Sequence, residues 1–156
     1  MPDVIIADTS VLIIFSKIDA LGLLQRMYGA VIVTPEVADE YGAVLPSWIS
    51  VRAAVDKKYV VLLRTQVDAG EASAIALGME FRGALLLLDD LKARKLAVNL
   101  GLRIAGTLGV ILKARERGVI ADVVPYIEKL RMSDFYISEV LMREVPGGGR
   151  MANGEW

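Results

Sequence analysis

The chain has 156 residues, of which 54% are hydrophobic, and its 18 basic and 19 acidic side chains give a formal net charge of −1. It has no cysteine and no histidine, which excludes disulfides and thiolate metal sites and removes the commonest general base and transition-metal ligand. Any chemistry must therefore depend on carboxylates, hydroxyls, lysines or arginines, and oxygen ligands favour Mg²⁺ or Mn²⁺ over Zn²⁺.

The apolar residues are distributed as in a protein that does not cross a membrane. No apolar run approaches the roughly 18 residues that a spanning helix needs, and the first residues do not form a signal peptide, so we expect a cytoplasmic protein. The high hydrophobic content then predicts a sheet buried on both faces. It also predicts an apolar surface for a homodimer, a higher oligomer or another partner.

The N-terminal part predicts a strand followed by two helices. Residues 4–7 form a short apolar run that ends at Asp8. After this turn, the apolar residues 11–15 predict a helix, because the whole run is too long for one strand. A second helix is expected from Asp19 to Tyr28, with Asp19 as N-cap and Gly29 as its end.

The next part predicts two more strands. Residues 31–33 form an apolar strand, and Thr34-Pro35 then supply an N-cap and a proline at the first position of a helix that Gly42 ends. Residues 46–56 predict a short helical or irregular connection. The apolar residues 59–63 predict a strand nearer an edge of the sheet.

The last part begins with Asp68 to Glu71, which open a helix to Met79. The five apolar residues 84–88 then predict a central strand that runs into Asp89 and Asp90. The remaining predicted elements are a helix to about Asn99, a strand at 103–105, a helix from Gly106 to about Arg117, helices at 122–130 and from Ser133 or Asp134 to Glu144, and a flexible tail at 147–156. Because strands and helices alternate, we predict one α/β domain over residues 1–146, a three-layer α/β/α sandwich around a mostly parallel sheet.

Carboxylates converge on one edge of this predicted sheet. Asp8 and the Asp89-Asp90 pair follow parallel strands, so they belong to the same edge, and Glu71 and Glu40 lie on helices that enter the region. Such carboxylates would repel each other unless a cation lies among them. Each also has a structural alternative, because Asp8, Asp89 and Asp90 could cap helices, Glu71 could form a capping box with Asp68, and Glu40 could lie on a solvated face.

Several segments resemble the motifs of the PIN-domain family. Asp8-x-Ser10 after an apolar strand resembles the first motif, residues 33–40 (VTPEVADE) resemble the second, and residues 70–77 (GEASAIAL) resemble the third. The stretch 87–97, with the glycine-containing segments that follow it up to Leu112, is similar to an archaeal and bacterial branch of the family. The similarity extends from Asp3 to about Leu141.

The resemblance implies a PIN-like fold and a metal-dependent endoribonuclease, often the toxin that a small antitoxin protein restrains. It implies that the acidic positions of the family are Asp8, Glu40, Glu71 and Asp90, which would bind Mg²⁺ or Mn²⁺ and act in catalysis on RNA. Asp89 could contribute, but Asp90 fits better because the family's acid stands one residue past the polar residue that ends the strand. Ser10 would support the first acid.

Other interpretations remain open at this stage. Residues 91–117 contain seven basic side chains against Glu116 alone, which indicates either a solvated helix face or a patch that attracts phosphate. Lys92 and Arg94 are candidates to hold the substrate backbone. Residues 11–15 and 135–137 could pack on the sheet, or they could form a homodimer or antitoxin surface. The competing functions are a non-catalytic RNA-binding or regulatory module and an aspartate-based phosphohydrolase.

Overall fold

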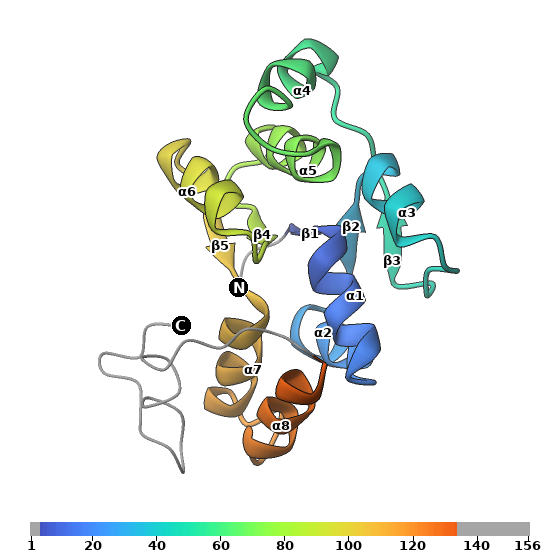
Figure 1. Ribbon diagram of the computed structural model, residues 1–156, viewed down its shortest axis with the longest axis vertical. Coiled ribbons are helices and arrows are strands. Elements are labelled where there is room, and N and C mark those ends of the chain that lie inside the picture. The colour runs from blue at the N-terminus through green and yellow to red at the C-terminus, as the bar shows by residue number, and fades with distance from the viewer. Residues whose placement is uncertain (1–3, 134–156) are drawn as a thin grey trace.

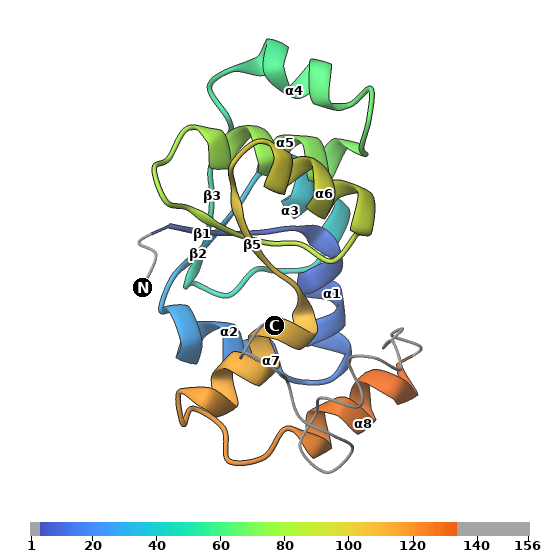
Figure 2. The same ribbon diagram turned by 90° about the vertical axis from the view of Figure 1, so that its left-hand side faces the viewer.

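The computed structural model describes residues 4–133 and contains a parallel sheet (Figures 1 and 2). Within these residues the sheet has five strands in the order β3-β2-β1-β4-β5, and every pairing is parallel. The strands are β1 (Ile5–Ala7), β2 (Val31–Val33), β3 (Ile49–Val51), β4 (Leu85–Leu87) and β5 (Arg103–Ala105). The predicted mostly parallel sheet is therefore confirmed.

The central strands are buried on both faces, which explains why their sequences are continuously apolar. In β1, Ile5 and Ala7 belong to one hydrophobic core, whereas Ile6 belongs to a second core on the opposite side of the sheet. In β4, Leu85 and Leu87 join the first core and Leu86 joins the second. Side chains that alternate between two dry faces leave no polar positions in such a strand.

Helices cover both sides of the sheet, as Figure 2 shows. One side carries α1 (Thr9–Lys17), α2 (Leu21–Tyr28), α7 (Thr107–Glu116) and α8 (Val124–Met132). The other side carries α4 (Lys57–Leu63), α5 (Ala69–Met79) and α6 (Leu91–Asn99). The short helix α3 (Pro35–Tyr41) follows β2 and packs on both α1 and α5. The α/β/α sandwich is confirmed, and none of the helices described combines the length and apolar character needed to cross a membrane.

The prediction of a strand at residues 59–63 is wrong, because these residues lie in α4. Asp56 caps this helix by accepting a hydrogen bond from the Tyr59 backbone N–H at 3.0 Å. Val60 and Leu63 are buried, whereas Leu62 is 60% exposed, and burial at a spacing of three residues is helical. The edge strand is instead β3, which lies inside the predicted connection 46–56.

The other differences concern helix boundaries. Ala20, not Asp19, is the N-cap of α2, and Asp19 has a positive φ of 55° in the turn before it. The helix predicted at 122–130 is α8, two residues later at each end. The predicted helix from Ser133 or Asp134 to Glu144, the apolar residues 135–137 and the tail 147–156 lie outside the described residues, apart from Ser133 itself, which is the C-cap of α8.

The one-sided burial of α4 can be tested by substitution. Leu63→Ala should lower the free energy of unfolding by about 2–4 kcal/mol, because it opens a cavity in the core between α4 and α5. The matched change Leu62→Ala, on the exposed face, should alter it by less than about 0.5 kcal/mol. Urea unfolding followed by circular dichroism measures both values. Similar losses for the two variants would contradict this orientation of the helix.

Candidate functional site

The predicted acids lie around the point where the strand order reverses. After β1 the chain adds β2 and β3 on one side, and it later adds β4 and β5 on the other side. The carboxyl ends of β1 and β4 therefore border the topological switch point, where open α/β sheets bind their ligands. Asp8 follows β1 directly, and its backbone N–H donates to the Leu87 carbonyl of β4 at 3.0 Å. Asp89 and Asp90 follow β4 after one further residue.

Asp8 is a buried carboxylate, only 4% exposed. It occupies the N-cap position of α1 but makes no capping hydrogen bond with its side chain. Its Oδ2 instead accepts a hydrogen bond from the Ser10 hydroxyl at 3.3 Å. Burial and the charges of Asp68 and Glu40 raise the pKa of Asp8 from 3.8 to about 6, although hydrogen bonds from Thr9 and Ser10 oppose the rise. The protein therefore holds a charge here at a free-energy cost.

Glu71 is also buried, 8% exposed, in the first turn of α5. It forms the capping box with Asp68: Glu71 Oε1 accepts from the Asp68 N–H at 3.2 Å, and Asp68 Oδ1 accepts from the Glu71 N–H at 2.9 Å. Burial and the charges of Asp68, Asp90 and Asp8 raise the pKa of Glu71 to about 7, although the hydrogen bond from the Asp68 backbone opposes the rise. Glu71 therefore caps α5 and also lies close enough to other acids for their charges to raise its pKa.

Glu40 reaches this region from α3. The Thr9 hydroxyl donates to Glu40 Oε2 at 3.4 Å, and the carboxylate lies so close to Gly70 that a Cβ there would collide with it. Partial burial raises the pKa of Glu40, and the charge of Asp68 adds to this, whereas hydrogen bonds from Thr9 and the Gly70 backbone lower it. A glycine at the start of α5 is therefore required by the close approach of a side chain from α3.

The adjacent aspartates have different partners. Asp90 is the exposed N-cap of α6, and its Oδ2 accepts from the Ala93 N–H at 2.9 Å. Asp89 accepts through both oxygens from one residue, Oδ1 from the Thr107 N–H at 2.7 Å and Oδ2 from the Thr107 hydroxyl at 2.6 Å. Asp90 acts electrostatically on Glu71, whereas Asp89 joins the end of β4 to the start of α7.

The two basic residues predicted to hold substrate also differ. Lys92 is exposed near the start of α6. Arg94 is half-buried, and its Nη1 donates to the Leu88 carbonyl at 3.1 Å. Its guanidinium lies where a Cβ on Gly106 would be, and its charge lowers the pKa of Asp89, which burial raises overall. Arg94 therefore packs beside the hydrogen bonds between Asp89 and Thr107, whereas Lys92 faces solvent.

Sequence reasoning missed a sixth acid, Asp68, which it treated only as a helix cap. Its charge contributes to the raised pKa of Asp8, Glu40 and Glu71. The capping-box spacing could have indicated this, because the N-cap of a helix must lie beside a residue in its first turn.

A buried hydrogen bond that sequence reasoning also missed connects the helices that carry these acids. The hydroxyls of Thr34 and Ser73 lie 2.6 Å apart. Thr34 caps α3 by accepting from the Val37 N–H at 3.2 Å, and Ser73 donates to the Gly70 carbonyl in α5 at 2.8 Å. The contact fixes α3 against α5, and hence Glu40 beside Gly70.

The donor set suits a hard divalent cation by its chemistry, because it consists of carboxylates. In three of them, Asp8, Glu40 and Glu71, burial and the charges of neighbouring acids raise the pKa. Glu71 accepts hydrogen bonds through Oε1 and Asp90 through Oδ2, whereas Asp89 accepts through both oxygens. Among residues 4–133, however, no three acidic side chains are arranged closely enough to hold a metal ion. The acids are therefore neighbours in electrostatic terms and do not form a ready-made coordination cluster.

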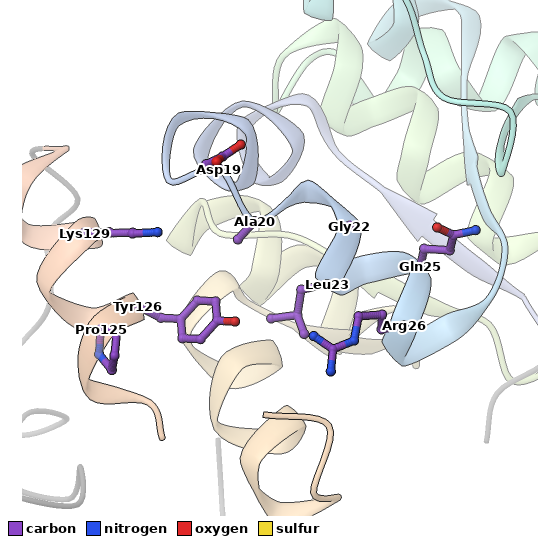
Figure 3. A pocket seen from close by; sticks show the side chains of 9 residues that line it. All are labelled: Asp19, Ala20, Gly22, Leu23, Gln25, Arg26, Pro125, Tyr126 and Lys129. Atoms are coloured by element: carbon purple, nitrogen blue, oxygen red, sulfur yellow. The ribbon is translucent and has the colours of Figure 1, made fainter. Parts of the chain in front are cut away.

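A separate hollow of about 610 Å³ lies between α2 and α8. Figure 3 shows Tyr126 and Lys129 pointing from α8 toward α2, which contributes Leu23 and Arg26. None of the predicted acids lines it. The candidate reaction site and this hollow are therefore built from different helices.

The chain was compared with models of known protein families. A family model described as DUF3368, a PIN domain, matches residues 4–146. Comparisons with curated proteins and with solved structures gave no significant match. The matched range covers most of the chain and contains all of the acids described above.

The raised pKa values predict how stability depends on pH. A carboxyl whose pKa is higher in the folded state than in the unfolded state contributes no penalty at low pH, and its penalty grows as pH rises through the folded pKa. Between about pH 4.5 and about pH 7.5, the unfolding free energy of the wild type should therefore fall. Asp8→Asn should raise it at the higher pH by about 1–3 kcal/mol, because one pKa unit corresponds to about 1.4 kcal/mol.

Urea titrations at the two pH values measure this effect. The matched control is Asp39→Asn, an exposed aspartate on α3, which should leave the pH profile unchanged. Loss of stability in Asp8→Asn at both pH values would contradict the assignment of a buried, repelled charge at this position.

Proposed function

This chain belongs to the PIN-domain family, and from that premise we propose that it is a metal-dependent endoribonuclease, the toxin of a toxin–antitoxin pair. One observation carries the proposal. Asp8 follows β1, and Glu40, Glu71 and Asp90 belong to α3, α5 and the cap of α6; the charge of Glu40 raises the pKa of Asp8, and the charges of Asp90 and Asp8 raise the pKa of Glu71. Glu71 also serves the capping box of α5, whereas Asp8 makes no capping hydrogen bond, and a divalent cation would offset the repulsion among these acids.

We assign Asp8, Glu40, Glu71 and Asp90 as the residues that would hold Mg²⁺ or Mn²⁺. Ser10 orients Asp8, and Thr9 orients Glu40, through the hydrogen bonds described above. We assign Asp89 a positioning role, because both of its oxygens bind Thr107.

The chemistry of phosphodiester hydrolysis fits this set. The reaction needs an activated water and neutralisation of the charge that develops on the phosphate, and a bound divalent cation supplies both. The chain has no histidine to act as a general base, so carboxylates are the groups available to accept or orient a proton. Lys92, exposed beside Asp90, is placed to attract the substrate backbone.

A second candidate is a non-catalytic RNA-binding module with the same fold. It is favoured by the finding that residues 4–133 contain no three acids close enough to hold a metal ion. RNA binding that a chelator leaves unchanged, with no product at any metal concentration, would support this candidate over the nuclease.

The proposal includes partners and location. We propose that the protein acts on RNA in the cytoplasm, that it forms a homodimer or higher oligomer, and that a small antitoxin protein restrains it. A small charged protein encoded next to this chain, which co-purifies with it and suppresses cleavage, would support the toxin role.

Cleavage should depend on the acids and on metal. Purified protein should cut single-stranded RNA with Mg²⁺ or Mn²⁺, and Asp8→Asn or Asp90→Asn should lower the rate by about 10³-fold, since metal stabilisation of the transition state is worth several kcal/mol. Asp39→Asn, on the exposed face of α3, should cut at the wild-type rate. Unchanged cutting by the Asp8→Asn, Asp90→Asn double variant would refute the nuclease assignment.

Substitution of Asp89 and of Asp90 should have different effects on the stabilisation of the protein by Mg²⁺. Millimolar Mg²⁺ should raise the melting temperature of the wild type, because a ligand that binds only the folded state stabilises it. Asp90→Asn should lose this increase, while asparagine preserves the helix cap. Asp89→Asn should start from a lower melting temperature, because its bonds to Thr107 weaken, but should keep the increase. The opposite pattern would make Asp89 the ligand.

A further inference from the structure

A second, smaller pocket lies between the edge strand β5 and the helix α7. Its volume is about 220 Å³, and the residues that line it include Arg103, Lys113, Arg117 and Tyr28. Figure 2 shows β5 running directly into α7, with α2, which carries Tyr28, next to α7. The pocket therefore combines residues of β5 and α7 with Tyr28 of α2 and Leu85 of β4, which are distant from them in the sequence.

The register of the sheet and the period of the helix bring the cations together. Arg103 pairs with Leu85 across the strands, and Ala105 pairs with Leu87. Leu85, Leu87 and Ala105 belong to the core on the α7 side, so Arg103, two residues before Ala105, lies on that same face of the sheet. On α7, Gly109, Lys113 and Arg117 all line the pocket, at a spacing of four residues that forms one stripe of a helix.

The pocket carries a concentrated positive charge. No carboxylate is among the described residues that line it. Lys113 Nζ also lies 3.2 Å from Glu116 Oε2. The side chains of this pair are 39% and 51% exposed, so water screens their interaction.

Tyr28 adds a hydrogen-bond donor to these cations. Burial raises the pKa of the Tyr28 phenol, and the charge of Arg117 opposes that rise. The phenol therefore stays protonated at neutral pH, and its O–H can donate to an anion. The other lining residues include the apolar side chain of Leu85, which offers no competing acceptor.

We propose that this pocket binds a phosphate group, either a backbone phosphate of bound RNA or a free phosphate anion. Arginine and lysine side chains with a hydroxyl donor are the groups that recognise phosphate oxygens. The volume is smaller than the roughly 300–1,000 Å³ typical of pockets for drug-sized ligands, which suits one charged group. The RNA source rests on the proposed function, whereas binding of free phosphate does not.

The position of the pocket fits an RNA strand that also reaches the acids. β5 spans three residues, roughly 10 Å, and its carboxyl end leads to Thr107, which binds Asp89 at the candidate site. An RNA strand bound along this edge would place one phosphate in the basic pocket and another near the switch point.

The test compares two double variants that remove the same charge. Arg103→Gln with Lys113→Gln alters the pocket, whereas Lys95→Gln with Arg115→Gln alters exposed residues of α6 and α7 that do not line it. Affinity for fluorescent single-stranded RNA is measured by anisotropy in the presence of chelator, so no cleavage is involved. The pocket variant should bind about tenfold more weakly, and its salt slope should fall by about 0.7, since each phosphate contact on a single strand contributes about 0.7. The control should change by less than about twofold.

The second arm uses inorganic phosphate at constant ionic strength. Phosphate should raise the melting temperature of the wild type and of the control variant, but not that of the pocket variant. Dependence of both RNA and phosphate binding on the pocket identifies a backbone phosphate, and dependence of phosphate binding alone identifies a free anion. Equal behaviour of the two double variants in both arms would overturn the proposal. If the double pocket variant does not fold, Arg103→Gln alone is compared with Arg115→Gln in the same arms.

Cleavage assays run in parallel keep this inference separate from the proposed function. Intact, pocket-dependent binding without any cleavage would reject the nuclease and leave the phosphate site standing. Metal-dependent cleavage together with RNA and phosphate binding that the pocket substitutions do not change would support the nuclease and reject the phosphate site.

Discussion

The Asp8 backbone donates to the Leu87 carbonyl at 3.0 Å, where β1 and β4 end side by side. This pairing joins the two halves of the sheet at its switch point, because every other strand lies outside β1 or β4. It also brings the buried carboxylate after β1 near the acids after β4. The parallel sheet therefore determines which part of the molecule can carry a cluster of carboxylates.

Polar contacts then fix the helices around this point. The buried Thr34–Ser73 contact holds α3 against α5, so that Glu40 lies on the backbone of Gly70. The Asp89–Thr107 contact holds the end of β4 to the start of α7. These bonds are satisfied within the protein, and among the described residues no buried side-chain nitrogen or oxygen lacks a partner. These hydrogen bonds fix the positions of the elements that carry Glu40, Asp89 and Gly70.

The net charge of −1 is the sum of an acidic region and a basic region that lie apart on the protein. Carboxylates collect at the carboxyl edge of the sheet, whereas the cations Arg103, Lys113 and Arg117 collect beside β5 and α7. The run of basic residues from 91 to 117 is divided by the fold, because Arg94 turns inward to Leu88 while the others remain near solvent or line the basic pocket. A single polyanionic strand could be attracted by one region and positioned against metal in the other.

Local patterns in the sequence were sufficient for the sheet class, for most helix starts and for the acids that end the strands. Thr34-Pro35 and the Asp68–Glu71 capping box are local signals, since their hydrogen bonds form within one helical turn. Continuous apolar runs at β1 and β4 were equally informative, because only a strand buried on both faces needs them.

Contacts between distant segments decided the rest. Residues 59–63 are apolar throughout, so only their one-sided packing on α5 makes them a helix. Asp89 and Asp90 are neighbours in sequence, and only Thr107, far along the chain, separates their roles. Asp68 was recognisable as a cap from the sequence, but its effect on Asp8 and Glu40 depends on distances that the fold sets. The sequence by itself thus determined which acids stand at strand and helix ends, and the tertiary structure decided which charges act on one another, because electrostatic interaction depends on separation and burial in space.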